Sequence, residues 1–98
     1  MKVSVLAVAQ HFTREGEGLM VGVKRAALCE ALAITHGNQT EAAKILGTYQ
    51  ASVCRRIDSL DVRAFWGATR SGLIRSWDDV LERLGVSSEG LRLLREVS

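Results

Sequence analysis

The sequence contains no proline, only two cysteines and no long apolar run. Two cysteines cannot form the disulfide framework of a small secreted protein, so we expect Cys29 and Cys54 to be reduced thiols in a cytoplasmic protein. No segment reaches the roughly 18 consecutive apolar residues of a membrane span, and we expect no membrane partner. Without proline, the turns must be formed by Gly, Asn, Asp and Ser.

An excess of one charge is also missing, because 13 Lys and Arg stand against 11 Asp and Glu, a net charge of +2. The hydrophobic fraction of 47% is too high for intrinsic disorder. A chain of 98 residues is too short for a Rossmann or TIM-barrel enzyme. It also carries no paired-carboxylate motif, nucleophile elbow or Gly-rich phosphate loop. We therefore expect one domain with a modest core, which is not an enzyme and needs no cofactor.

Metal binding is not expected either. Two His and two Cys are the candidate zinc ligands, but they show neither CxxC nor HxxxH spacing. Cys54 stands next to two arginines, which suggests either a thiol with a lowered pKa that senses oxidants or, more simply, a small helix residue.

The N-terminal residues 1–23 are interpreted as an extension that packs on the domain. An apolar run after Lys2 resembles a signal peptide but is too short for one. Residues 3–12 fit a strand by alternation and a helix by spacing, so both remain open. Residues 13–18 have loop composition, and residues 19–23 fit either the end of a hairpin or the beginning of the next helix.

Three helices are predicted in the middle of the chain. The first covers residues 24–36 and has an apolar stripe of Ala27, Leu28, Ala31, Leu32 and Ile34, followed by Gly37. A short helix over about 41–46 follows, with Thr40 as its N-cap and Gly47 at its end. The third helix covers about 49–59 after Thr48 as cap, and it buries Val53, Ile57 and Leu60.

The pattern then changes to a predicted β-hairpin. Residues 62–66 are β-favouring, residues 67–72 have turn composition, and residues 73–75 form a second short strand candidate. Ser76 is expected to cap a helix that ends at Gly85, and a last helix follows over about 88–97. The expected fold is mainly α with a small β-hairpin wing, a winged helix-turn-helix over residues 24–75.

Two short helices joined by a tight turn at Gly47 are typical of a helix-turn-helix, whose second helix lies in the major groove of DNA. Gln pairs with adenine, Ser is adaptable, and Arg contacts guanine or phosphate. Tyr49 fits a core aromatic and a DNA contact equally well. The exposed positions expected on this helix are Tyr49, Gln50, Ser52, Arg55, Arg56 and Ser59.

The residues also resemble two known families. Gly37-Asn38-Gln39-Thr40-Glu41-Ala42-Ala43-Lys44-Ile45-Leu46-Gly47 is similar to the GNQTxAAxxLG signature of Fis-type helix-turn-helix proteins. Residues 49–61 resemble the recognition helix of LysR-type N-terminal domains, and Ala64-Phe65, Arg70 and Gly72-Leu73 resemble their wing. The resemblance implies DNA binding by a dimer, with Thr40, Tyr49, Gln50, Ser52, Arg55 and Arg56 at or near the DNA. The LysR-type effector domain has no counterpart in this chain, so we expect no small-molecule effector.

The charge distribution agrees with DNA binding. Residues 24–75 hold eight basic and four acidic residues, whereas residues 76–98 hold three basic and five acidic ones and are expected to form a dimer interface. We predict a prokaryotic, sequence-specific regulator of transcription that binds a palindromic site on double-stranded DNA as a homodimer. Gln50, Ser52 and Arg55 are the predicted base contacts, and Thr40, Lys44, Arg56 and Arg70 the predicted phosphate or wing contacts. A protein-binding adaptor, or a nucleoid or DNA-segregation protein without strong sequence preference, is the alternative.

Overall fold

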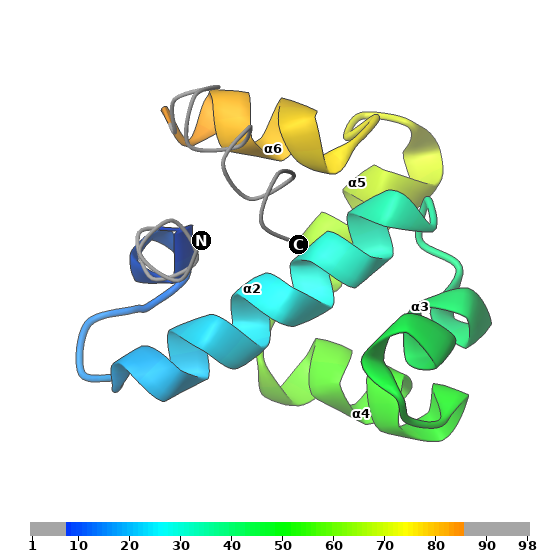
Figure 1. The fold of residues 1–98 in the computed structure, drawn as a ribbon, viewed down its shortest axis with the longest axis horizontal. Coiled ribbons are helices and arrows are strands. Elements are labelled where there is room, and N and C mark those ends of the chain that lie inside the picture. Colours follow the sequence, from blue (N-terminus) through cyan, green and yellow to red (C-terminus); the bar gives the residue numbers. More distant parts are fainter. Residues whose placement is uncertain (1–7, 86–98) are drawn as a thin grey trace. The chain divides into compact units, whose positions relative to one another are not determined.

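The computed structural model describes residues 8–85, and all of their regular structure is helical (Figure 1). A short helical stretch at residues 8–11 precedes five helices, α2 (Leu19–Ile34), α3 (Gln39–Leu46), α4 (Gln50–Ser59), α5 (Arg63–Ser71) and α6 (Trp77–Arg83). The chain divides into two compact units. One covers Ala27–Trp77, and the other combines residues 8–26 with residues 78–85 of the described part. Among the described residues, no helix is long and apolar enough to cross a membrane.

The predicted β-hairpin wing is wrong. Residues 63–71 form α5, residues 72–76 contain no strand, and none of residues 8–85 is in a β-strand. The β-favouring residues are helical because their buried positions follow helical spacing, with Val62 and Thr69 buried and Trp66 between them half-buried. Strand propensity depends strongly on context, and here burial of one helix face overrides it. The glycine expected in the wing instead ends α5, where Gly72 takes a φ of +87°.

Helix α2 begins earlier and ends earlier than the predicted helix over 24–36. Residues 19–23 belong to it, so the alternative of a hairpin at this point is excluded. Leu28, Ala31 and Leu32 are buried as predicted, whereas Ala27 and Ile34 are exposed. The end is set by two successive left-handed residues, His36 with a φ of +54° and Gly37 with +82°. The Gly37 backbone N–H donates to the Leu32 carbonyl at 2.8 Å, which satisfies an end group of the helix.

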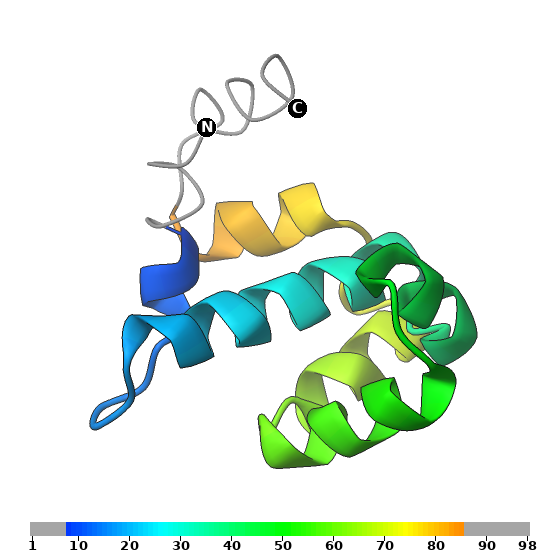
Figure 2. The same ribbon diagram turned by 60° about the horizontal axis from the view of Figure 1, so that its bottom comes forward.

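Helices α3 and α4 confirm the predicted pair, but their caps differ from the prediction. Asn38, not Thr40, caps α3, because the Asn38 backbone is extended and its Oδ1 accepts the Glu41 N–H at 3.0 Å. Tyr49, not Thr48, occupies the N-cap of α4 and makes no side-chain capping bond. Gly47 ends α3 as predicted, with a left-handed φ of +69°. Helix α4 buries Val53 and Ile57 and packs against both α3 and α5, and Figure 2 shows α4 and α5 side by side.

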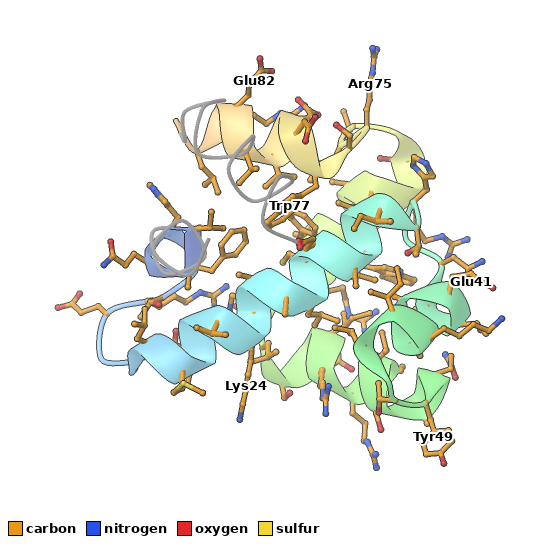
Figure 3. The ribbon with its side chains drawn as sticks, in the orientation of Figure 1. Lys24, Glu41, Tyr49, Arg75, Trp77 and Glu82 are labelled. Atoms are coloured by element: carbon orange, nitrogen blue, oxygen red, sulfur yellow. The ribbon has the colours of Figure 1, made fainter. Side chains whose placement is uncertain are left out.

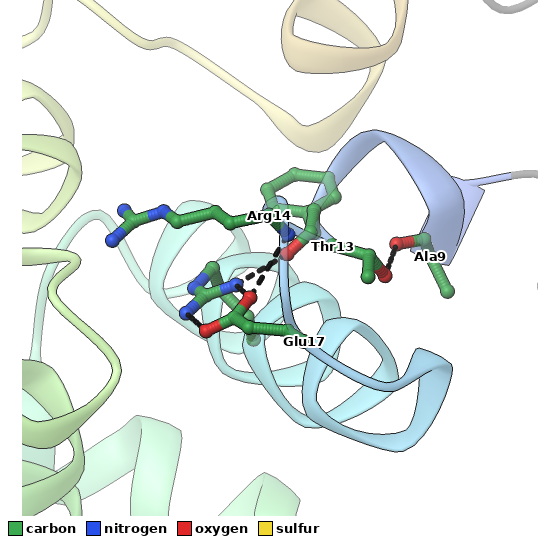
Figure 4. Close-up of polar contacts among 6 residues, drawn as sticks. Ala9, Thr13, Arg14 and Glu17 are labelled. Atoms are coloured by element: carbon green, nitrogen blue, oxygen red, sulfur yellow. Dashed lines mark hydrogen bonds and ion pairs between the residues drawn. The ribbon is translucent and has the colours of Figure 1, made fainter.

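The other unit contains residues 8–11 and the first turns of α2. Gly22 is buried there, and a Cβ at this position would lie 1.8 Å from Thr13 Oγ1 and 2.6 Å from the Ala9 carbonyl oxygen. Thr13 Oγ1 donates to the same Ala9 carbonyl at 2.8 Å (Figure 4). Only a glycine therefore allows α2 to approach this segment so closely. Helix α6 matches the helix predicted after Ser76 and buries Val80 and Leu81, while the helix predicted over 88–97 lies outside the described residues.

A buried arginine fastens the loop before α2. The Arg25 guanidinium is almost fully buried and donates to both carboxylate oxygens of Glu17, at 2.7 and 2.8 Å, and to the Phe12 carbonyl. The Arg14 backbone N–H donates to the same carboxylate at 2.9 Å (Figure 4). The hydrogen bonds from Arg25, followed by the one from Arg14, lower the pKa of Glu17 from 4.5 to about 2.

This shift predicts a specific acid sensitivity of the fold. Because Glu17 is ionised in the folded state at a pH where the unfolded chain is already protonated, its contribution to stability is complete above pH 4.5 and is lost as the pH falls to about 2. We expect wild type to be more stable than Glu17→Gln at pH 6 and the difference to disappear near pH 2. Urea unfolding of both proteins across this pH range measures the difference in their free energies of unfolding. A difference that does not change with pH would contradict the assignment.

Candidate nucleic-acid interface

Helix α4 carries all three of the side chains predicted to contact bases. Val53 and Ile57 face the core, so Gln50, Arg55 and Arg56 are exposed and Ser52 is partly exposed. Tyr49 is 81% exposed, which excludes the core role that was open for it. Figure 3 shows the Tyr49 side chain directed away from the helices at the turn between α3 and α4. An exposed helix of ten residues with polar side chains at its N-terminal end has the form of a recognition helix.

Gln50 is held by a second glutamine at the start of α3. Its Nε2 donates to Gln39 Oε1 at 2.8 Å. One amide hydrogen and the carbonyl oxygen of Gln50 are left for another partner, and the side chain has lost part of its rotamer freedom in advance. Sequence analysis placed Gln39 in a turn and missed this role. The sequence feature that could have indicated this role is a side chain with both a donor and an acceptor group, placed in the first turn of the helix that precedes α4.

The arginines of α4 differ in their neighbours. Arg55 Nη2 lies 3.3 Å from Ser52 Oγ, and within residues 8–85 neither Arg55 nor Arg56 has a carboxylate partner. Asp58, the one acidic residue of α4, is instead paired with Arg63 of α5, whose Nε lies 3.0 Å from Asp58 Oδ1. This hydrogen bond raises the pKa of Arg63. The paired carboxylate therefore weakens the positive charge of Arg55 and Arg56 less than a free one would.

Two of the predicted phosphate contacts lie on α3. Thr40 and Lys44 are both exposed. Lys44 forms an exposed ion pair with Glu41, with 3.2 Å between Nζ and Oε1. Exposed pairs of this kind contribute roughly 0–1 kcal/mol, so Lys44 can exchange its partner for a phosphate at little cost.

Arg70 is not at the tip of a wing but in the last turn of α5. Its guanidinium lies over the Trp66 indole, 5.3 Å from the ring centre. Both side chains line a groove of about 700 Å³ that also contains Gln50. The structure thus brings Arg70 and Gln50 together, although the element predicted to carry Arg70 does not exist. The remaining lining residues are Thr35, His36, Gly37, Asn38 and Gln39.

The cysteines and histidines form no metal site among the residues that the structure describes. Cys29 is buried in the core and Cys54 is exposed on α4. In the described part of the chain, neither cysteine forms a disulfide.

A scan of protein-family models and searches of curated proteins and of solved structures found no match to this chain. The resemblance to Fis-type and LysR-type sequences therefore stays a prediction. The function proposed for the chain rests on its own residues.

Proposed function

We propose that this chain binds double-stranded DNA through α4, in a sequence-specific manner, and regulates transcription. The observation that carries the proposal is the exposed surface of α4. Gln50, Ser52 and Arg55 stand outward on it, while Gln39 of α3 fixes the amide of Gln50. A helix of this width fits the major groove of B-DNA. The wing is not part of the proposal, because α5 occupies its place.

The chemistry of these side chains favours contacts to purines. The free hydrogen and the carbonyl oxygen of the Gln50 amide match N7 and N6–H₂ of adenine. The Arg55 guanidinium matches O6 and N7 of guanine, and Ser52, which already neighbours it, can orient it. Arg56, Thr40 and Lys44 are assigned to phosphates, since they are exposed on α4 and α3 and phosphate contacts set the register of the protein on DNA.

A protein-binding adaptor is the second candidate, and one observation favours it. Tyr49 and Ile45 are 81% and 53% exposed and stand four residues apart at the end of α3 and the turn that follows. Exposed apolar side chains of this size often mark protein contacts. The four cations assigned to DNA (Lys44, Arg55, Arg56 and Arg70) favour the nucleic-acid function over this alternative.

A titration of the whole chain against random duplex DNA separates the two functions. The three cations assigned to phosphates (Lys44, Arg56 and Arg70) give a slope of roughly −2.7 in the plot of log K against log salt, so affinity is expected to fall roughly 40-fold between 50 and 200 mM salt. Fluorescence anisotropy of a labelled duplex measures the affinity at each salt concentration and therefore the slope. Absence of binding at 50 mM, or an affinity independent of salt, would contradict the proposal and favour the adaptor.

Two further parts of the proposal concern assembly and location. A homodimer on a palindromic site stays a prediction, because the residues expected to form its interface extend beyond the described part of the chain. In a prokaryotic cell, which has no nucleus, a regulator of transcription would act in the cytoplasm.

A further inference from the structure

The groove beside Gln50 has a composition that suits an anion. Eight residues from the α2–α3 turn, the starts of α3 and α4, and α5 line it, and none of them is acidic. Arg70 supplies a full positive charge, and the side chains of Asn38, Gln39 and Gln50 supply amide groups. A groove with one cation, several neutral donors and no carboxylate attracts a group of negative charge.

The structure holds Arg70 in place without neutralising it. Its guanidinium carbon lies over the Trp66 ring, 5.3 Å from the ring centre, and a contact of this kind leaves the positive charge without a neutralising partner. Among residues 8–85 no carboxylate or carbonyl accepts a hydrogen bond from Arg70. An arginine already ordered and still unpaired loses little conformational entropy when it binds an anion.

Trp66 is itself held by a hydrogen bond. Its indole Nε1–H donates to the Gly37 carbonyl at 2.9 Å, which ties α5 to the turn between α2 and α3. Gly37 lies directly against Arg70, since a Cβ on this glycine would be 2.3 Å from Arg70 Cγ. The stem of Arg70 therefore lies against Gly37 and its guanidinium carbon lies over the indole, so both parts of the side chain have a packing partner.

We infer that this groove binds one phosphate group of the DNA backbone, with Arg70 as the binding residue and Trp66 as a positioning residue. The inference rests on the proposed function and deepens it, because the phosphate is assigned to the same groove that Gln50 lines. A phosphate held beside Gln50 fixes how far α4 enters the major groove. The contact carries no sequence information itself but sets the register in which Gln50 meets a base.

Removing the charge of Arg70 tests the inference. The salt dependence of duplex affinity is measured for wild type, Arg70→Gln and Lys24→Gln, in which the control removes an exposed lysine of α2. Arg70→Gln is expected to make the negative slope of log K against log salt less steep by about one. It is also expected to weaken binding to all duplex sequences equally. The control is expected to keep the wild-type slope. If wild type binds and Arg70→Gln keeps its slope, the inference is wrong while the proposed function stands. If wild type does not bind, the proposed function itself fails.

The positioning role of Trp66 has a separate readout. Trp66→Leu is expected to reduce the slope as Arg70→Gln does, with no further loss when both changes are combined, because both act on one contact. Trp66→Phe keeps an aromatic face under the guanidinium and is expected to restore most of the slope. Additive losses in the double variant would show that Trp66 acts only on the fold, and would overturn this role.

A titration with inorganic phosphate distinguishes a backbone phosphate from a free one. Phosphate added at constant ionic strength is expected to shift the NMR signal of the Trp66 indole N–H in wild type but not in Arg70→Gln. The groove would be assigned to a free phosphorylated ligand if phosphate shifts the signal in wild type while Arg70→Gln keeps the wild-type salt slope of duplex affinity. That result would overturn the DNA assignment. Absence of any shift at phosphate concentrations up to tens of millimolar, together with an unchanged slope, would exclude an anion site.

Discussion

Replacing Arg55 and Arg56 together by alanine is expected to weaken duplex DNA binding roughly 30- to 700-fold. Arg55 is assigned to a base, and loss of a bidentate arginine contact costs about 1–3 kcal/mol. Arg56 is assigned to a phosphate and adds about 1 kcal/mol at moderate salt, so the total is about 2–4 kcal/mol. The salt slope is expected to fall as well, and discrimination between binding sites is expected to relax at the base that Arg55 contacts. Anisotropy titrations with a selected and a random duplex measure all three effects.

The double variant should keep its fold, which makes the loss of binding interpretable. Both arginines are exposed, they have no carboxylate partner among the described residues, and alanine favours a helix at least as well as arginine. A matched control removes two cations from other helices, Lys24→Ala in α2 together with Arg83→Ala in α6. If the control weakens binding as much as the α4 variant does, net charge rather than α4 governs the affinity. An unchanged affinity of the folded α4 variant would show that α4 is not the recognition helix.

Substituting Gly37 by alanine is expected to lower the free energy of unfolding by about 2–5 kcal/mol. A residue with a Cβ pays about 1–2 kcal/mol for the left-handed backbone that Gly37 adopts at a φ of +82°. The added Cβ would also lie 2.3 Å from Arg70 Cγ and 2.9 Å from Thr69 Oγ1, and overpacking of this kind costs about 1–3 kcal/mol. Thr69 is buried, so it cannot move aside as an exposed side chain would.

Gly67→Ala serves as the matched control and should have the opposite sign. Gly67 lies inside α5, and a Cβ there would meet no atom within 4 Å. Alanine in an exposed helix interior is about 0.5–1 kcal/mol more favourable than glycine. Urea unfolding of wild type and both variants measures the free energies. Equal stability of Gly37→Ala and wild type would contradict the described packing of α5 against the α2–α3 turn.

Local signals in the sequence were sufficient for α3, α4 and the turn between them. Ala42, Ala43, Val53 and Ile57 recur at helical spacing and are buried, and Gly47 takes the left-handed conformation that only glycine adopts at low cost. The exposed side chains of α4 follow directly from this register. Their assignment as candidate DNA contacts therefore needed no tertiary information.

The prediction of a β-hairpin wing was wrong because it rested on local residue preferences that are weak. Residues 62–66 favour strands and residues 67–72 favour turns, each by a fraction of a kcal/mol per residue. Packing of one face of α5 adds more than this, and part of it comes from outside the segment, since the Trp66 indole N–H donates to the Gly37 carbonyl 29 residues earlier. The predicted N-cap of α3 was wrong for a similar reason. Asn38 and Thr40 are both good N-caps, and the conformation of the preceding turn decides between them.

The sequence by itself determined which residues of the α3–α4 pair are buried and which carry the charge, because helical periodicity within ten residues contains that information. Only the tertiary structure decided that Gln39 lies against Gln50 and that Arg70 joins them in one groove. Gln39 and Gln50 belong to different helices, and Arg70 lies on a third. Their position around one groove depends on how three helices pack and on the sharp turn at His36 and Gly37, and the periodicity of a single helix contains neither.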